Sequence, residues 1–251
     1  MLLLKQCIKA IAFHLFPHFK HYNERLSNIE VAIAAVAAGK HTSDENALNG
    51  QQNRKQIVSF ILSKLHPHMI VETGTHLGHS TGYFARFCKN IFTSDSNPIY
   101  MWAAQSRLID LDNIIFYTGD SRVFLHELSE KTCGLPNQEL FFYLDAHWHE
   151  DLPLHEELKI ICEGWLKSNW IILIDDFCVP DDCGYNFPSY GRNKTLNYDY
   201  LKDLVELHKL NVFYPTIQSS EETGNKSGHI FLCNGGVALE ILKKTENIKE
   251  A

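Results

Sequence analysis

The sequence contains no apolar run long enough to cross a bilayer, no repeated segment and no low-complexity tract. A membrane-spanning helix needs about 20 apolar residues, whereas the apolar N-terminal stretch is broken by Lys5 and Lys9. Basic residues are not in excess either, because the formal net charge of the 251 residues is −7. Such a charge argues against broad binding of nucleic acid. We therefore expect a globular protein with no nucleic-acid partner.

The cysteines lack the spacing of a redox or metal-binding motif. There are 7 of them, an odd number, and no two form a Cys-x-x-Cys pair. A disulfide framework is typical of secreted proteins and would show paired spacings. We therefore expect mostly buried thiols in a reducing compartment, and hence a cytoplasmic protein.

The N-terminal segment, residues 1–50, is predicted to be a helical appendage. Apolar residues recur at helical spacing from Tyr22 to Ala38, and the polar, aperiodic stretch His41–Asn53 follows. This change divides the chain into an appendage, 1–50, and a main domain, 51–251. The basic, amphipathic start of the appendage fits three roles: docking on its own domain, peripheral contact with a membrane surface, or formation of a homodimer.

Residues Met69–Thr81 are typical of a short buried strand, a glycine-bearing turn and a helix that begins near Ser80. Gly74 permits a positive φ and a close approach to a ligand, and Gly78 permits close packing where the helix starts. The first N–H groups of the helix, beginning near Ser80, would point at the ligand. The turn lacks the Gly-x-Gly-x-x-Gly pattern of a dinucleotide site, and Glu72 would place a negative charge beneath a pyrophosphate. The pattern therefore favours a different nucleoside ligand.

Apolar strands and helical patterns alternate through the main domain, which predicts a parallel sheet built of βαβ units. The expected strands are Met69–Thr73, Ile91–Asp95, Ile114–Thr118, Leu140–Asp145 and Trp170–Asp175. The expected helices between them include Pro98–Leu108, Ser121–Leu128 and Leu154–Trp165. Two further strands, Val212–Gln218 and His229–Cys233, would close the sheet as an antiparallel hairpin. The predicted fold class is therefore α/β, with a doubly wound, mostly parallel sheet.

Acidic residues stand where the predicted strands end. Because ligands of open α/β sheets bind at the carboxyl ends of the strands, these residues would meet in one place. Asp95 ends the second strand, 23 residues after Glu72, and an acid in this position typically binds a ribose diol. Asp120 and Ser121 follow the third strand, where they fit either an adenine edge or the cap of the next helix.

Three carboxylates, those of Asp145, Asp175 and Asp176, lie at the ends of the fourth and fifth predicted strands. Neighbouring carboxylates repel one another unless a cation lies between them, and an all-oxygen ligand set suits Mg²⁺, Mn²⁺ or Ca²⁺. Such an ion would hold a substrate hydroxyl and lower its pKa. The other interpretation is that one carboxylate caps a helix and another accepts backbone hydrogen bonds. His147 or His149, just after Asp145, would act as general base.

The segment Phe177–Tyr200, after the fifth predicted strand, is long for a structureless loop. It is also more aromatic than a solvated loop, with Tyr185, Phe187, Tyr190, Tyr198 and Tyr200 among its residues. Both features fit a lid over a substrate and a loop packed on the core.

The motifs IVETGTHLGHST, TSDSNP, GDS, YLDAHW and LIDDF follow one another between residues 55 and 180. In order and spacing they resemble the class I S-adenosylmethionine-dependent methyltransferases. The pattern is most similar to the metal-dependent small-molecule O-methyltransferases, such as catechol O-methyltransferase and the macrolide-sugar O-methyltransferases. The resemblance implies a Rossmann-like sheet of seven strands with its last strand antiparallel, and S-adenosylmethionine above the first two strands.

The resemblance also assigns roles to single residues. It implies that the cofactor is contacted by Glu72, Gly74, Asp95, Asp120 and Ser121, and that Mg²⁺ is held by Asp145, Asp175 and Asp176. Two departures concern the base: Ala146 follows the first metal aspartate, and His147, Trp148 and His149 stand where catechol-type enzymes carry a lysine. The sugar-modifying relatives are similar in using histidine, which favours a sugar unit or another non-catechol alcohol as acceptor.

The predicted function is therefore S-adenosylmethionine-dependent, divalent-metal-assisted O-methyl transfer to a hydroxyl of a small acceptor. Methyl transfer is an in-line displacement that needs an oriented oxygen nucleophile and little covalent help from the protein. Two other classes of function stay open at this point. One is a non-catalytic domain of the same fold that binds a nucleoside or a protein partner. The other is a nicotinamide-dependent oxidoreductase, which the missing glycine pattern and Glu72 disfavour.

Overall fold

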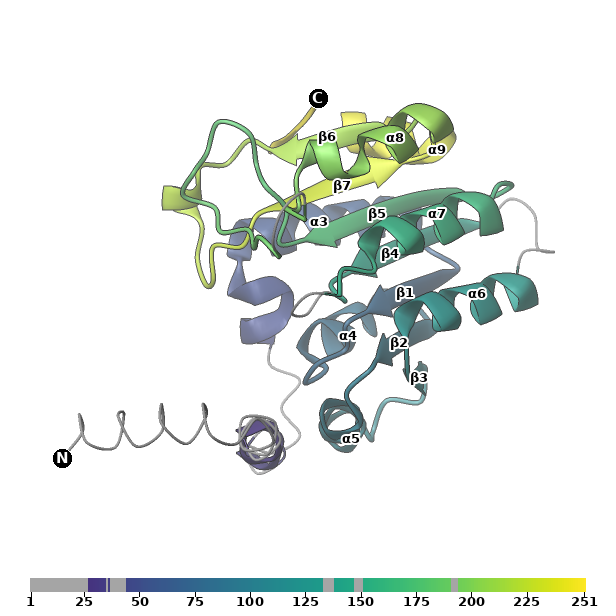
Figure 1. Ribbon diagram of the computed structural model, residues 1–251, viewed down its shortest axis with the longest axis vertical. Coiled ribbons are helices and arrows are strands. Elements are labelled where there is room, and N and C mark those ends of the chain that lie inside the picture. The colour runs from purple at the N-terminus through teal and green to yellow at the C-terminus, as the bar shows by residue number, and fades with distance from the viewer. Residues whose placement is uncertain (1–26, 35, 37–43, 133–137, 147–150, 191–193) are drawn as a thin grey trace, which may run out of the picture.

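The computed structural model describes residues 27–34, 36, 44–132, 138–146, 151–190 and 194–251 (Figure 1). Its centre is an eight-stranded sheet with the order β3-β2-β1-β4-β5-β7-β6-β8. Strands β1 to β5 pair in parallel, whereas β7 runs antiparallel to both β5 and β6. The strands are β1 (Met69–Thr73), β2 (Ile91–Asp95), β3 (Ile114–Thr118), β4 (Glu139–Leu144), β5 (Asn169–Asp175), β6 (Asn211–Pro215), β7 (His229–Cys233) and β8 (Ile248–Glu250).

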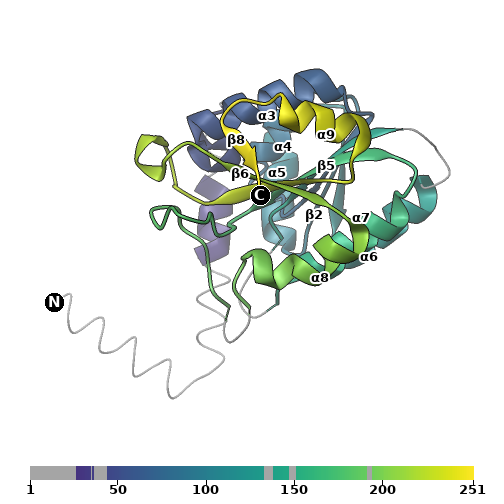
Figure 2. The ribbon, with the colours of Figure 1, turned by 90° about the horizontal axis from the view of Figure 1, so that it is seen from above.

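Helices cover both faces of this sheet, as Figure 2 shows from above. One face carries α3 (Gln52–Leu65), α4 (His79–Phe84) and α9 (Gly236–Lys243), and the other carries α6 (Ser121–Thr132), α7 (Leu154–Gly164) and α8 (Tyr198–His208). A further helix, α5 (Pro98–Arg107), contacts β2 and β3. The sheet is thus the middle layer of three.

Side chains of the central strands alternate between two cores. Phe142 and Ile172 belong to the core with α6, α7 and α8, whereas Phe141 and Ile171 belong to the core with α3, α4 and α9. Because both faces are covered, the strands are apolar along their whole length rather than at every second residue. Most of the acidic residues of these strands therefore stand at or just after the strand ends.

The chain reverses its direction of travel across the sheet at β1. It moves outward from β1 to β2 and β3, then crosses back to β4 on the other side of β1. The carboxyl ends of β1, β2 and β4 therefore surround the switch point, where open α/β sheets bind ligands.

Just after β2, the side chain of Asn97 accepts a hydrogen bond from the Ile99 N–H, and Pro98 occupies the first turn of α5. This cap starts α5 immediately beyond Asp95.

The predicted fold class is confirmed, and the strand boundaries agree to within one residue for β1 to β5. The sheet has one strand more than the seven expected, because β8 pairs antiparallel with β6. This edge strand has only 3 residues and two of them are charged, so it carries no period-two apolar pattern from which a strand is predicted.

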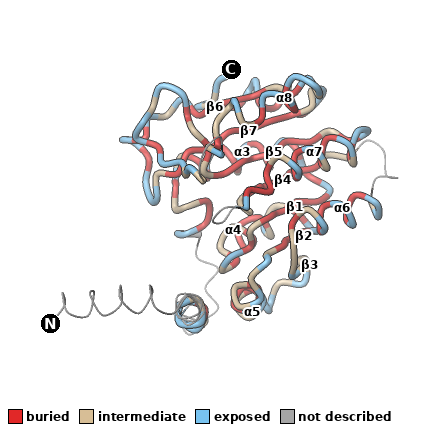
Figure 3. Tube along the Cα trace, in the orientation of Figure 1, coloured by how far each residue is buried: buried red, intermediate tan, exposed pale blue. Residues whose placement is uncertain are grey.

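Part of the segment assigned to the appendage packs with the main domain. Residues 44–50 form the irregular turn η1 (Asp44–Gly50), whose Ala47 and Leu48 are buried in the core with α3 and α4. The helical residues 27–34 lie beside α5 and are largely exposed (Figure 3). No helix in the described ranges is both long and apolar enough to cross a membrane. The stretch expected to contact a membrane surface falls in residues 1–26, outside the described residues.

Candidate functional site

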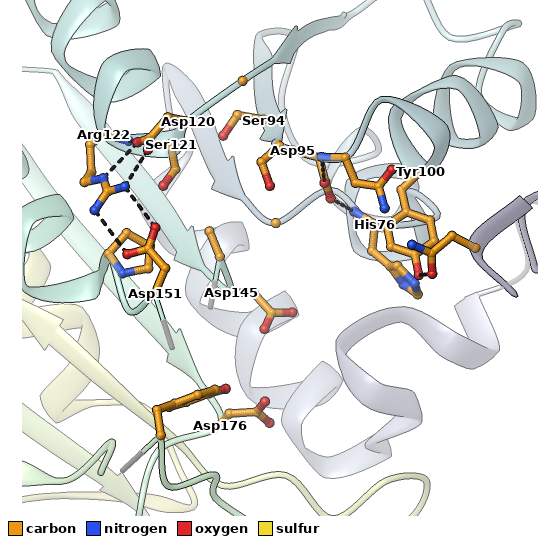
Figure 4. Close-up of a pocket in the computed structure, with 18 residues that line it drawn as sticks. His76, Ser94, Asp95, Tyr100, Asp120, Ser121, Arg122, Asp145, Asp151 and Asp176 are labelled. Carbon is orange, nitrogen blue, oxygen red and sulfur yellow. Dashed lines mark hydrogen bonds and ion pairs between the residues drawn. The ribbon is translucent and has the colours of Figure 1, made fainter. Parts of the chain in front are cut away.

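A cavity of about 380 Å³ opens at the carboxyl ends of β1 to β5. Small-molecule sites typically begin at about 300 Å³, so this cavity suits a nucleoside-sized ligand. Figure 4 shows three groups around it: Asp95 with His76, Asp120 with Arg122, and Asp145 with Asp176. Of the residues predicted to form the site, those that line the cavity are Gly74, Asp95, Asp120, Ser121, Asp145 and Asp176.

The turn after β1 is locked to the end of β2. The N–H groups of Gly74 and Thr75 both donate to the Ser94 carbonyl, at 2.8 and 3.0 Å, and the His76 N–H donates to Asp95 Oδ2 at 2.7 Å. The Gly78 N–H donates to the Thr75 carbonyl at 2.8 Å. These turn N–H groups are thus used within the protein, and the expectation that the first N–H groups of the following helix point at a ligand stays a prediction. The turn is thus fixed against β2 at the rim of the cavity, which Gly74 and His76 line.

Asp95 is held in one orientation at the rim. Besides the His76 N–H, it accepts the Asn97 N–H through Oδ1 at 2.8 Å. Burial raises the pKa of Asp95, and these two N–H groups partly oppose that effect. Beside it, the His76 ring meets Tyr100 edge-on at 4.5 Å, and the Tyr100 hydroxyl donates to Asn28 at 2.8 Å. The helical residues around Asn28 therefore close this end of the cavity, which no sequence pattern indicated.

Three residues predicted to contact the cofactor are absent from the described lining of the cavity. Glu72 lies in the interior, where Oε2 accepts the hydroxyls of Thr81 at 2.5 Å and Thr93 at 2.6 Å. Gly78 caps α4 and packs against α5, and the Ser80 hydroxyl accepts the Leu48 N–H at 3.1 Å. The Glu72 Oε1 atom is buried and has no hydrogen-bond partner among the described residues.

Glu72 makes stability depend on pH in a predictable way. Burial raises its pKa from the ordinary 4.5 to about 7, and the two threonine hydroxyls only partly offset this. Between these pH values the folded protein keeps a proton that the unfolded chain has released, so the free energy of unfolding falls as pH rises. The change corresponds to at most about 3 kcal/mol.

We expect Glu72→Gln to remove that dependence and to unfold at higher urea concentration than the wild type at pH 8. The measurement is urea unfolding at pH 4.5 and pH 8, followed by circular dichroism. Glu240→Gln removes the same charge from an exposed position and should leave the pH dependence unchanged. If the stability of Glu72→Gln changed with pH as much as that of the wild type, the Glu72 carboxyl would not be the group that binds the proton.

Asp120 caps α6 and is paired with a basic residue that the sequence analysis did not single out. Its Oδ1 accepts the Arg122 N–H at 2.8 Å, and its Oδ2 accepts Arg122 Nη2 at 2.5 Å. The hydrogen bond from Arg122 lowers the pKa of Asp120. Arg122 also bridges Asp151 and Glu156, at 3.0 and 3.2 Å. These contacts support the helix-cap interpretation of Asp120, and Ser121 lines the cavity beside it.

Asp145 and Asp176 form the acidic end of the cavity (Figure 4). Tyr190 lines the same cavity, so one residue of the predicted lid faces it, whereas Phe177, Tyr185 and several neighbours are buried in the core. The described part of the segment 177–200 therefore packs on the core and also forms part of the cavity wall. The two candidate bases, at positions 147 and 149, lie outside the described residues.

Asp175, the third predicted metal ligand, points away from the cavity into a buried network. Its Oδ1 accepts Arg54 Nη1 and the Asp176 N–H, both at 2.8 Å, and the Ser227 hydroxyl at 3.2 Å. Its Oδ2 accepts Asn49 Nδ2 at 3.1 Å and the Tyr143 hydroxyl. A carboxylate offers about four lone-pair positions. The Ser227 hydroxyl has one proton and also faces Asp176, but the other four donors already match these positions and leave Asp175 no free position for a metal.

The metal-ligand expectation therefore does not fit the donors present. Among the described residues, no group of three or more His, Cys, Asp or Glu side chains is placed to hold a metal ion. The Asp176 carboxylate accepts the Ser227 hydroxyl, and Asp145 Oδ2 accepts Tyr143 at 3.2 Å. Asp145 and Asp176 line the cavity, whereas Asp175 is hydrogen-bonded in the interior.

Comparison with known proteins adds the fold. No family model matches the chain. The chain is similar to the O-methyltransferase from Bacillus cereus in complex with SAH, at a TM-score of 0.52 and 16% identity over 82% of this chain and 90% of that chain. It is also similar to the O-methyltransferase TomG from Streptomyces achromogenes, solved with SAM, at a TM-score of 0.49 and 16% identity over 72% and 80% of the two chains. The first similarity shows that this chain shares the α/β fold of that protein.

Proposed function

We propose that the protein is an S-adenosylmethionine-dependent O-methyltransferase acting on a hydroxyl of a small acceptor. The observation that carries the proposal is one cavity, lined from five consecutive parallel strand ends, with Asp95 fixed at the end of β2. An acid at this position suits the two hydroxyls of a ribose. The likeness of the fold to an O-methyltransferase crystallised with SAH supports the same ligand class.

The residues around the cavity fit such a cofactor. Asp95 presents a fixed carboxylate to the ribose. Ser94 also lines the cavity, and its buried hydroxyl has no hydrogen-bond partner among the described residues. An unpartnered buried hydroxyl is costly, so a ligand that bonds to it would be favoured. Gly74, with φ of +90°, allows the ends of β1 and β4 to approach closely at the rim of the cavity, because a Cβ there would lie 2.4 Å from the Asp145 carbonyl oxygen. Ser121 would lie by the adenine.

The acidic end of the cavity would receive the acceptor. When bound, S-adenosylmethionine supplies a sulfonium methyl group: the acceptor oxygen forms the new C–O bond, the C–S bond breaks, and its electron pair stays on the sulfur of a neutral thioether. Asp145 and Asp176 can accept a hydrogen bond from the hydroxyl and orient its oxygen. The hydroxyl proton would pass to one of these carboxylates and then to water. No step of this proposal goes through a metal ion, because Asp175 is fully hydrogen-bonded.

A sugar unit is the acceptor class that we propose. Sugars present adjacent hydroxyls, and two carboxylates beside a tyrosine are suitable partners for them. Asp145, Asp176 and Tyr190 are the described residues that provide this set.

The test is calorimetric titration of S-adenosylmethionine into the wild type, Asp95→Ala and Asp112→Ala. We expect micromolar binding by the wild type and a loss of about 10- to 100-fold in Asp95→Ala, because hydrogen bonds to a charged group contribute about 1.5–3 kcal/mol. Asp112 is exposed and outside the cavity lining, so its variant carries the same charge change and should bind normally.

Absence of binding by the wild type would refute the proposed function. If binding is found, mass spectrometry of reactions with glycosides and with catechols tests the acceptor. We expect a gain of one methyl group on the glycosides, and product from the catechols alone would contradict the sugar assignment.

A further inference from the structure

The acidic strand ends contain a cation that belongs to the chain itself. Arg54, in the first turn of α3, is fully buried and lies 2.8 Å from Asp175, whose side chain is equally buried. Its guanidinium also donates to Gln51 at 3.0 Å and lies 5.8 Å from the centre of the Tyr143 ring. A divalent ion was expected among these same carboxylates.

The fold holds Arg54 in this place from several sides. The N–H groups of Asn53 and Arg54 donate to the Glu222 carboxylate at 3.1 and 3.3 Å, which fixes the start of α3. An acidic side chain at a helix N-terminus is favourable. The neighbouring turn η1 contributes Asn49, which donates to Asp175 and has a left-handed φ of 61°. The arrangement is therefore built into the backbone and is not a chance contact of a long side chain.

The electrostatics of the pair agree with the geometry. Burial alone would lower the pKa of Arg54, but its interaction with Asp175, and to a smaller extent with Tyr143 and Asp145, raises it above its ordinary value. Burial alone would raise the pKa of Asp175, and Arg54 together with the hydrogen bonds lowers it to about 2. Both groups thus stay charged in the interior, and each neutralises the other.

We propose that Arg54 takes the place of the divalent cation at the carboxyl ends of β4 and β5, so that the site works without a metal ion. Arg54 is a positioning residue: it holds Asp175, and Asp175 orients Tyr143, whose hydroxyl also contacts Asp145 at the cavity. This end of the cavity then presents Asp145 and Asp176, and no metal ion, to the acceptor. This inference rests on the proposed function for its meaning, but its test does not require turnover.

The test uses Mn²⁺, whose electron paramagnetic resonance signal falls when the ion binds to protein. The full-length protein is titrated with Mn²⁺ with and without S-adenosylmethionine. We expect the wild type to leave the free-ion signal unchanged, and EDTA to leave any methyl transfer unchanged. Stoichiometric binding of Mn²⁺ that Asp145→Asn abolishes would overturn the proposal.

Arg54→Met supplies the second arm, because it removes the cation and one of the donors from Asp175 Oδ1. A folded Arg54→Met that binds Mn²⁺ supports the exchange of one cation for the other, and a folded variant that does not bind overturns it. If the variant fails to fold, the wild-type titration still decides whether the site takes a metal. The two proposals fail in different measurements. The proposed function fails if the protein does not bind S-adenosylmethionine, whereas the Mn²⁺ titration tests the role of Arg54 whether or not that cofactor binds.

Discussion

Arg54→Met is expected to lower the free energy of unfolding by about 3–5 kcal/mol, because it leaves the buried Asp175 carboxylate without its cation. Both side chains are 0% exposed, so water cannot replace the lost partner. Asp175→Asn should cost a similar amount by leaving the guanidinium unpaired. The measurement is unfolding in urea, followed by circular dichroism. Losses below about 1 kcal/mol for both variants would place the pair in the range of exposed ion pairs and contradict the network.

The double variant separates the pair from its surroundings. Arg54→Met combined with Asp175→Asn should cost clearly less than the sum of the two single changes, since the double variant contains no unpaired buried charge. Lys202→Met is the matched control, because Lys202 lies 3.9 Å from Glu206 on the exposed side of α8. That surface pair should change stability by no more than about 0.5 kcal/mol. Additive costs in the cycle would show that Arg54 and Asp175 act independently.

The sequence predicts the positions of the strand ends well, and with them much of the cavity. The strands β1, β2 and β3 have the predicted bounds, because each is a short apolar run closed by a polar residue. Asp95 and Asp145 therefore line the cavity, as expected from their places after β2 and β4. Because ligands of open α/β sheets bind at this edge, the predicted strand ends also predict which residues line the site.

Adjacent residues at a strand end cannot be assigned in the same way. Asp175 and Asp176 are identical in type, yet Asp175 faces the interior and Asp176 faces the cavity. The difference follows from the left-handed φ of 54° at Asp176, which turns the chain just after β5. A pattern of residue types does not contain that dihedral angle.

Partners that come from distant parts of the chain also leave no local pattern. Arg54 lies 121 residues before Asp175 and sits on an ordinary amphipathic helix. Asn28 reaches the cavity from the helical segment before the main domain through Tyr100, 72 residues further on. An unpaired acidic cluster in a sequence therefore predicts that a cation is present, but not whether the protein supplies it or a metal does.

Gly74→Ala is expected to reduce both stability and cofactor affinity. A Cβ at Gly74 would lie 2.4 Å from the carbonyl oxygen and 2.6 Å from the carbonyl carbon of Asp145, so the ends of β1 and β4 must separate. The left-handed φ of +90° adds about 1–2 kcal/mol of backbone cost, and the overlap adds about 1–3 kcal/mol. Because Asp145 and Ala146 line the cavity, we also expect at least about a tenfold rise in the dissociation constant of S-adenosylmethionine.

Gly235→Ala isolates the effect of the close approach. Gly235 has a similar φ of +101°, but an added Cβ would meet nothing within 4 Å, and the residue is far from the cavity, before α9. This variant should lose only the backbone cost and keep normal affinity in calorimetry. Equal losses of thermal stability in the two variants, with affinity unchanged in both, would show that the β1 and β4 ends tolerate a side chain between them. A larger loss of thermal stability in Gly74→Ala, together with weaker binding, would instead show that the shape of the cavity depends on the close contact between these two strand ends.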